Sequence, residues 1–264
     1  MEITPLSPQN QAAVLAYLRR APYRNALPLS NASQLRARCD VLVAETEGMV
    51  RGVASTYRDL PIPNLTFATE SIVVMSDLLA ALAGRNPALR EATAWALLPE
   101  DRYHQLARLA TVEGYEIEYQ MVVEPETLRA PDGPETRRLT ADDLPALNEL
   151  AAAAGLTVWH ERALELGPAF GCFADGRLMA MAGTHFATPE IVEIGHIATH
   201  PEARRRGYAS ACTAALTRAA FVLAPRVFLM VLDHNTAALA AYKRLGFRAV
   251  DRFHLTRFRL QRPS

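Results

Sequence analysis

Three short motifs occur twice in this chain of 264 residues, and they recur at a nearly constant spacing. In each copy a capping sequence precedes a stretch rich in alanine and leucine, an acidic residue and a glycine separate two apolar runs, and a glycine and an aromatic residue follow a helical pattern. The pairs are Leu6–Asn10 with Leu139–Asp143, Glu47-Gly48 with Asp175-Gly176, and Gly114-Tyr115 with Gly246-Phe247. Their offsets of 133, 128 and 132 residues indicate an internal duplication.

A stretch with three prolines and a glycine separates the two copies at residues 125–135. Proline and glycine at this density are typical of a linker. We therefore expect an N-terminal domain over residues 1–124 and a C-terminal domain over residues 136–264.

The second half has the clearer pattern of secondary structure. Strands come first and then alternate with helices, which predicts a mixed, mostly antiparallel α/β sheet flanked by helices. Helices are expected at residues 141–154, 159–166, 207–223 and 235–246, and strands at residues 169–174, 178–186, 191–199, 227–232, 247–250 and 254–258.

The charge balance excludes several classes of protein. The 28 basic and 28 acidic residues cancel, so no basic field favours a nucleic acid or an anionic membrane. The longest apolar stretch, residues 219–232, is interrupted by Pro225 and Arg226 and is too short to span a bilayer. The three cysteines are widely spaced, which favours reduced thiols in a cytoplasmic protein and argues against a metal site.

The turn at residues 200–210 is the strongest candidate for a binding site. It follows a predicted strand and opens a helix, and Gly207 and Ala209 leave the backbone amides of the first helical turn uncovered. The arginines at 204–206 add positive charge, so the turn is suited to a pyrophosphate. The simpler interpretation is a solvated charge run before an ordinary helix.

Two further features lie close to this turn in the predicted fold. Asn235, Ala238 and Tyr242 share one face of a helix, although Asn235 is equally suited to an N-cap and Tyr242 to a core position. Glu193 stands in an otherwise apolar strand, where a carboxylate is costly to bury unless it has a partner, a function or a position at the water-exposed rim.

Residues 193–247 carry a resemblance to the GNAT superfamily of acyl-CoA-dependent N-acetyltransferases. The family's Arg/Gln-x-x-Gly-x-Gly/Ala motif is present as Arg204-Arg205-Arg206-Gly207-Tyr208-Ala209, and its Asn, Ala, Tyr and Gly-Phe pattern as Asn235, Ala238, Tyr242 and Gly246-Phe247. The similarity covers about residues 136–259. Thr199 stands where an aliphatic residue is usual, and Ala209 replaces the second glycine.

The resemblance implies a site for acetyl-CoA and no metal. The loop amides would bind the pyrophosphate, the strand at 197–199 would diverge from its neighbour and pair with the pantetheine, and an amide of Ile197 or Ala198 would polarise the thioester carbonyl. The implied coenzyme-binding residues are Ile197, Ala198, Thr199, Arg204, Arg205, Arg206, Gly207, Tyr208, Ala209, Ser210 and Asn235.

The resemblance also implies the catalytic groups. Tyr242 would protonate the leaving thiolate, and Glu193 would act as the base for the attacking amine. His196 is the alternative base, whereas His200 and His234 are expected to be structural. The implied activity is acetyl transfer to a primary amine of a small molecule or amino acid by direct attack in a ternary complex. A catalytically silent acyl-CoA sensor is the alternative, and the sequence does not indicate an oligomeric state.

The first half lacks the residues that mark this site. Counting back by the repeat length from Gly207 leads to residues 74–77, which contain no arginine and no glycine, and counting back from Tyr242 leads to Ala110. The chain therefore resembles the tandem, FR47-like branch of the superfamily, with a degenerate first half. This half would line the acceptor pocket, with Tyr23 or Trp95 as candidates, or would be an unrelated ligand-binding domain.

Overall fold

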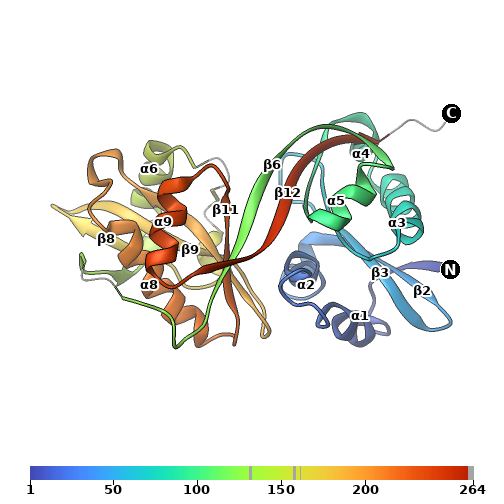
Figure 1. The fold of residues 1–264 in the computed structure, drawn as a ribbon, viewed down its shortest axis with the longest axis horizontal. Coiled ribbons are helices and arrows are strands. Elements are labelled where there is room, and N and C mark those ends of the chain that lie inside the picture. Colours follow the sequence, from blue (N-terminus) through green and yellow to red (C-terminus); the bar gives the residue numbers. More distant parts are fainter. Residues whose placement is uncertain (131–132, 157–158, 161, 261–264) are drawn as a thin grey trace. The chain divides into compact units, whose positions relative to one another are not determined.

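The computed structural model describes every residue except 131–132, 157–158, 161 and 261–264. The chain forms two compact units (Figure 1). Unit 1 comprises Met1–Tyr119 and Asp251–Ser264, and unit 2 comprises Gln120–Val250. Among the described residues, none of the helices combines the length and the apolar character that a membrane crossing needs.

Unit 1 is an α/β unit with one mixed sheet. Its strands lie in the order β1-β2-β3-β4-β5-β12-β6; β4 is parallel to β5, and β12 is antiparallel to β5. Its elements are β1 (Glu2–Pro5), α1 (Gln11–Leu18), α2 (Ala26–Ala32), a 3-10 turn (Arg36–Arg38), β2 (Cys39–Thr46), β3 (Met49–Tyr57), β4 (Asn64–Ala68), α3 (Ile72–Arg85), α4 (Ala88–Glu91), β5 (Ala94–Pro99), α5 (Glu100–Leu106) and the first part of β6 (Ala110–Val123).

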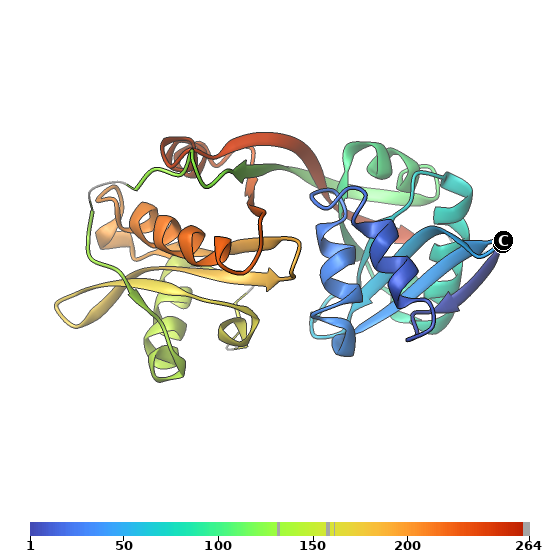
Figure 2. The ribbon, with the colours of Figure 1, turned by 90° about the horizontal axis from the view of Figure 1, so that it is seen from below.

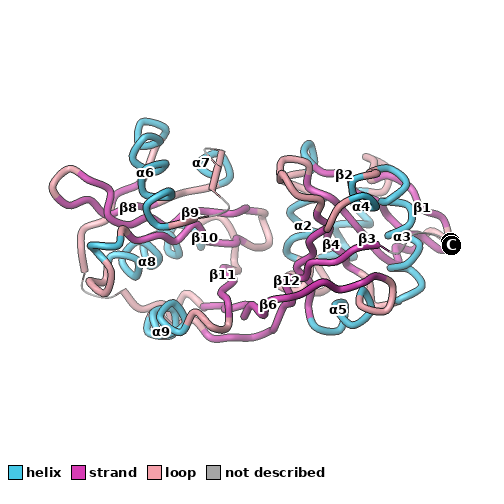
Figure 3. The backbone as a smooth tube through the Cα atoms, turned by 90° about the horizontal axis from the view of Figure 1, so that it is seen from above, coloured by secondary structure: helices cyan, strands magenta, loops and turns pink. Residues whose placement is uncertain are grey.

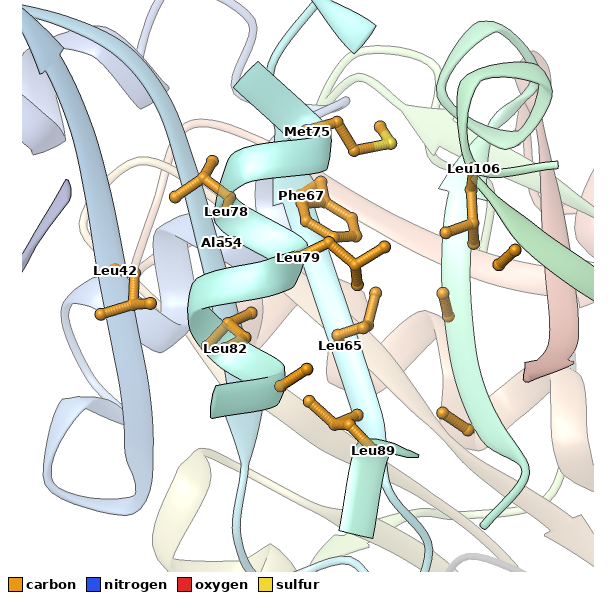
Figure 4. Close-up of a cluster of buried hydrophobic side chains, with 14 of the residues drawn as sticks. Leu42, Ala54, Leu65, Phe67, Met75, Leu78, Leu79, Leu82, Leu89 and Leu106 are labelled. Carbon is orange, nitrogen blue, oxygen red and sulfur yellow. The ribbon is translucent and has the colours of Figure 1, made fainter. Parts of the chain in front are cut away.

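Helix α3 provides much of the core of unit 1. The side chain of Ser71 accepts a hydrogen bond from the amide of Val74 and so caps the start of the helix. Figure 4 shows Leu79 of α3 beside Leu65 and Phe67 of β4, and these side chains, like Leu78 and Leu82 of the same helix, are almost completely buried. Burial of such an apolar face, rather than helix propensity, stabilises a helix of this length.

Unit 2 has the same order of elements as unit 1. Both units run strand, two helices, three strands, helix, strand, helix and strand, and unit 1 differs by the additional short helix α4. The elements of unit 2 are β7 (Arg137–Arg138), a 3-10 turn (Ala141–Asp143), α6 (Leu144–Ala154), α7 (Ala163–Leu166), β8 (Phe170–Ala174), β9 (Arg177–Ala187), β10 (Val192–Thr199), a 3-10 turn (Pro201–Ala203), α8 (Tyr208–Phe221), β11 (Val227–Leu232), α9 (Thr236–Arg244) and the start of β12 (Arg248–Leu260).

The sheet of unit 2 has helices on both faces, as predicted. Its strands lie in the order β6-β11-β10-β9-β8-β7. Helices α6 and α8 pack on β9 and β10 from opposite sides (Figures 2 and 3). On one side Leu147 and Leu150 pack with Met181 and Ala198, and on the other Cys212 of α8 contacts the carbonyl of Ala180. The alternation of neighbouring strand residues between the two faces accounts for this arrangement.

The two predicted tight hairpins are confirmed. Glu47 and Gly48 have φ angles of 52° and 71°, and Asp175 and Gly176 have φ angles of 50° and 77°. Two successive left-handed residues form the turn that matches the twist of an antiparallel pair. These turns join β2 to β3 and β8 to β9, so this part of the repeat is present in the structure.

Other parts of the prediction differ from the structure. Gly114 lies inside β6 and does not end a helix, whereas Gly246, with φ of 98°, does follow α9. The two closing strands predicted around residues 247–258 are one strand, β12. The predicted helix at 159–166 is reduced to α7, and residue 161 lies outside the described residues.

The division into units also differs from the expected domain boundaries. Residues 251–264 group with unit 1, and the end of β6 groups with unit 2. The physical reason is that β12 pairs with β5 over residues 253–258, while β6 lies beside β11. The expected linker, of which residues 131–132 are not described, belongs to unit 2, where the amide of Arg129 donates to the carbonyl of Leu245 at 2.9 Å.

Candidate functional site

Strands β10 and β11 diverge in the middle of the unit 2 sheet. They pair in parallel only at Val192 with Val227 and at Glu193 with Phe228, although β10 continues to Thr199. Beyond Glu193 the edges of the two strands are therefore open to a ligand. The resemblance implies a divergence at residues 197–199, and the structure has it.

A β-bulge lies at the same point of β10. Gly195 pairs with Gly183 and Ala198 pairs with Met181, so His196 and Ile197 face a single residue of β9. His196 has a φ of 46°, which is uncommon for a residue with a side chain. A bulge of this kind re-aims side chains and interrupts pairing, and it often lies next to an active site.

Helix α8 begins beside this divergence with an open N-terminus. Gly207, in the left-handed region at φ of 81°, is the N-cap and provides no side-chain hydrogen bond. The first backbone bond of the helix runs from the amide of Ala211 to the carbonyl of Gly207 at 3.0 Å. The amides of the preceding residues thus have no acceptor within the helix, and such amides favour an anion.

A cavity of about 720 Å³ extends from this N-terminus to the divergence of the strands. Helix α9 and the end of α6 contribute further parts of its wall. The predicted site residues that line it are Ile197, Ala198, Thr199, Arg204, Arg205, Gly207, Tyr208, Ala209, Ser210, Asn235 and Tyr242. Two predicted residues do not line it: the guanidinium of Arg206 lies over the ring of Tyr208, 5.5 Å from its centroid, and Glu193 lies deeper in the sheet.

Asn235 and Tyr242 are positioned by α9. The side chain of Asn235 accepts a hydrogen bond from the amide of Ala238 at 3.2 Å, so it is the N-cap that its residue type suggested. Tyr242 is buried, and burial raises the pKa of its hydroxyl to about 12. Its hydroxyl therefore stays protonated near neutral pH and is a hydrogen-bond donor at the cavity wall.

Glu193 has a partner that the sequence analysis did not identify. Its carboxylate lies 2.9 Å from Nδ1 of His185 on β9, and its side chain is only 7% exposed. His185 was missed because strict alternation along β9 does not place it beside Glu193. The register shifts between Glu193 and Ile194, which gives β9 one extra residue there.

His196, the alternative base, lies in a cluster of aromatic rings. Its ring centroid is 4.3 Å from that of His185 and 5.3 Å from that of Trp159, in both cases edge to face. Burial lowers the pKa of His196 to about 2, with smaller contributions from His185 and His160. Its imidazole is therefore a poor acceptor of a proton near neutral pH.

His200 and His234 lie at other positions. Nδ1 of His200 accepts a hydrogen bond from the amide of Glu202 at 3.4 Å and so caps a 3-10 turn, as a structural residue does. His234 is exposed, and its ring lies 3.6 Å from the carboxylate of Asp233. Within the part of the chain that the structure describes, His, Cys, Asp and Glu side chains form no group of three that could hold a metal ion.

Comparisons with known proteins identify the fold. Residues 135–247 match the model of the Acetyltransferase (GNAT) family. A Drosophila protein superimposes with a TM-score of 0.71 at 17% identity, covering 97% of this chain and 98% of its own. A GCN5-related N-acetyltransferase from Sphaerobacter thermophilus gives a TM-score of 0.67 at 15% identity, covering 100% of this chain and 96% of its own.

A third solved structure has the same tandem organisation. It is a tandem GNAT protein from the clavulanic acid biosynthesis pathway, with a TM-score of 0.67 at 14% identity, covering 100% of this chain and 99% of its own. No curated protein matches this chain in sequence. Identities this low establish a common fold and leave the substrate open. The family match and the fold together support acyltransferase activity in general.

Proposed function

We propose that this chain, whose residues 135–247 match the Acetyltransferase (GNAT) family, transfers an acetyl group from acetyl-CoA to a primary amine of a small molecule or amino acid. The observation that carries the proposal is the cavity that joins the open N-terminus of α8 to the divergence of β10 and β11. We also propose that unit 2 is the catalytic domain and that unit 1 is a degenerate GNAT-like domain.

The residues that line the cavity fit the chemistry of coenzyme A. A pyrophosphate needs several donors without bulky side chains, and Gly207, Ala209 and the amides of the first turn of α8 offer them. The pantetheine carries amides, and β10 beyond Glu193 has no strand partner on its β11 side. Acetyl-CoA bound there would supply the thioester from which the acetyl group is transferred.

Two groups of this chain are proposed to handle protons. The Tyr242 hydroxyl, protonated near neutral pH, would donate toward the leaving sulfur from the cavity wall. Glu193, at the last paired position of β10 and β11, would promote loss of a proton from the acceptor amine. Direct attack of the amine requires both groups to act in one ternary complex.

Thermal unfolding with acetyl-CoA tests the coenzyme site, with Ala209→Glu as the key variant. A carboxylate in the first turn suits the helix dipole, so the helix should form normally, while the new charge repels a pyrophosphate at the cavity wall. Acetyl-CoA at about one hundred times its Kd should stabilise the wild type by about 2.7 kcal/mol, which is about 5–10 °C. Ala209→Glu should lose this shift.

Thr236→Glu is the matched control, because it places the same charge in the first turn of α9, on an exposed residue outside the cavity wall. It should keep the shift. Release of free thiol from acetyl-CoA with a panel of primary amines then tests turnover. No shift in the wild type contradicts the coenzyme site, and a shift without thiol release from any amine contradicts the proposed transferase and favours an acyl-CoA sensor.

A further inference from the structure

The contact between His185 and Glu193 changes the assignment of the base. We propose that His185 is the catalytic residue that takes the proton from the acceptor amine, and that Glu193 is a positioning residue that acts through it. This inference rests on the proposed acetyltransferase function and names the group that contacts the acceptor.

The side chains of His185 and Glu193 differ in solvent exposure. The side chain of Glu193 is 7% exposed and that of His185 is 38% exposed. A general base must come within hydrogen-bond reach of the proton that it removes. Glu193 lies under the imidazole and already contacts Nδ1, so His185 presents the accessible atoms of the pair.

The geometry of the pair suits proton acceptance at Nε2. The carboxylate oxygen lies 2.9 Å from Nδ1, which favours the tautomer with its hydrogen on Nδ1 and the lone pair on Nε2. An Asp or Glu that holds a histidine in this way fixes its tautomer and stabilises the imidazolium that forms. The contact with Glu193 therefore orients the His185 ring and stabilises the positive charge of its protonated form.

Two irregularities in neighbouring strands bring the ring to this place. The register shift between Glu193 and Ile194 gives β9 its extra residue at His185, and the bulge at residues 196–197 gives one to β10. Between them Gly195 pairs with Gly183. The imidazole of His185 lies directly over Gly195, where a Cβ atom would overlap it.

A ring contact links His185 to the residue that precedes Ile197 in the chain. His185 packs edge to face on His196, 4.3 Å between centroids, and the next residue in the chain, Ile197, lines the cavity. On the other side of His196 lie Trp159 and His160, with centroid distances of 5.3 and 6.1 Å.

The proton step follows from these positions. A primary alkylamine reaches the site as an ammonium ion, because its pKa is about 10. One N–H bond breaks, its electron pair stays on nitrogen as the attacking lone pair, and the proton moves to Nε2 of His185. The new C–N bond then forms as the C–S bond of the thioester breaks, and a second proton passes from nitrogen to the leaving sulfur, which gives the amide and the free thiol. The imidazolium is neutralised by Glu193 and returns the proton to solvent after product release.

His185→Ala tests the proposal with two acceptors, an alkylamine and an arylamine, the second of which is already neutral near pH 7. With the alkylamine, kcat/KM should fall by about 10²–10⁴-fold, the usual contribution of a general base. With the arylamine the loss should be much smaller, and added imidazole should restore part of the alkylamine rate. An equal loss with both acceptors and no rescue would overturn the proposal, because a merely structural role predicts that result. A wild-type rate in His185→Ala would overturn it as well.

A pair of glycine variants tests the position of the His185 ring without removing the ring. Gly195→Ala should displace the imidazole and reduce alkylamine turnover while the acetyl-CoA shift is kept. Gly183→Ala is the matched control on the paired strand, because its nearest contact, Cβ of His196 at 3.5 Å, is ordinary. Equal alkylamine rates in the two variants would contradict the assigned position of His185.

Nitrogen NMR of the wild-type imidazoles gives a readout independent of turnover. Neutral His185 should carry its hydrogen on Nδ1, and Glu193→Gln should weaken this preference; a hydrogen on Nε2 would overturn the inference. If the wild type releases no thiol with any amine, the proposed function fails, whatever the tautomer. If the wild type releases thiol and the His185 variants release it at the same rate, the inference about His185 alone fails.

Discussion

Tyr242→Phe removes one oxygen from the cavity wall and leaves the ring in place. Burial raises the pKa of the Tyr242 hydroxyl to about 12, against about 8.5 for a thiol. Complete proton transfer to the thiolate would then be uphill by about 5 kcal/mol, at 1.36 kcal/mol per pKa unit. The hydroxyl should therefore act mainly by donating a hydrogen bond to the negative sulfur.

That conclusion sets the size of the effect. A hydrogen bond to a charged group contributes about 1.5–3 kcal/mol, so kcat should fall about 10- to 150-fold in Tyr242→Phe. The assay is thiol release at saturating acetyl-CoA and amine, with the thermal shift as a check that the coenzyme still binds. Because the hydroxyl loses its proton only near pH 12, no basic limb of the rate profile between pH 6 and 9 should belong to Tyr242. A loss below about threefold, or above about 10,000-fold with binding intact, would refute this reasoning.

Two further predictions concern stoichiometry and stability. Titration calorimetry should find one acetyl-CoA per chain. Helix α8 begins with a glycine that leaves its first amides open to an anion, whereas the Ser71 side chain already accepts from an amide of the corresponding helix α3. Two equivalent sites would contradict the assignment of unit 1 as degenerate. Gly246→Ala should lower the free energy of unfolding by more than the 1–2 kcal/mol that a left-handed alanine costs, since its Cβ would overlap the carbonyl of Thr127. Gly176→Ala, also left-handed but open to solvent, should incur only the conformational cost, and equal losses measured by denaturant unfolding would contradict the overlap.

Local patterns in the sequence predicted most of unit 2. Strand β11 has the predicted ends, and Asn235 caps α9 as its residue type suggests. The turn before α8 was predicted because glycine and arginine at that spacing have a direct physical meaning: an open backbone and a positive charge beside free amides. Such features depend on a few adjacent residues, so they can be inferred without the tertiary structure.

Pairings between distant strands could not be predicted in the same way. Strand β12 pairs with β5 of the first half of the chain and not with β11 of its own half. Nothing in the composition of β12 indicates this choice, because its residues suit a place beside either strand. The His185–Glu193 contact was missed for a related reason. Period-two counting assumes a regular ladder, and the register shift beside Glu193 breaks that assumption.

The same divergence of parallel strands occurs in unit 1, but other residues lie at the opening between the strands. There β4 and β5 pair only at Asn64 with Trp95 and at Leu65 with Ala96. Leu65 occupies the pairing position that Glu193 has in unit 2, so unit 1 has an apolar side chain in place of that carboxylate.

The opening beyond Leu65 in unit 1 is occupied by a side chain of the chain itself. Arg102 of α5, only 3% exposed, donates to the carbonyl of Phe67 on β4 at 2.8 Å and to the side chain of Asn25 at 2.7 Å. A strand edge that leaves its partner must have its buried carbonyl groups satisfied by some donor. In unit 1 the guanidinium supplies that donor permanently. In unit 2 the corresponding edge borders the cavity, where a ligand with amides of its own can supply it, which is why we expect the coenzyme in unit 2 alone.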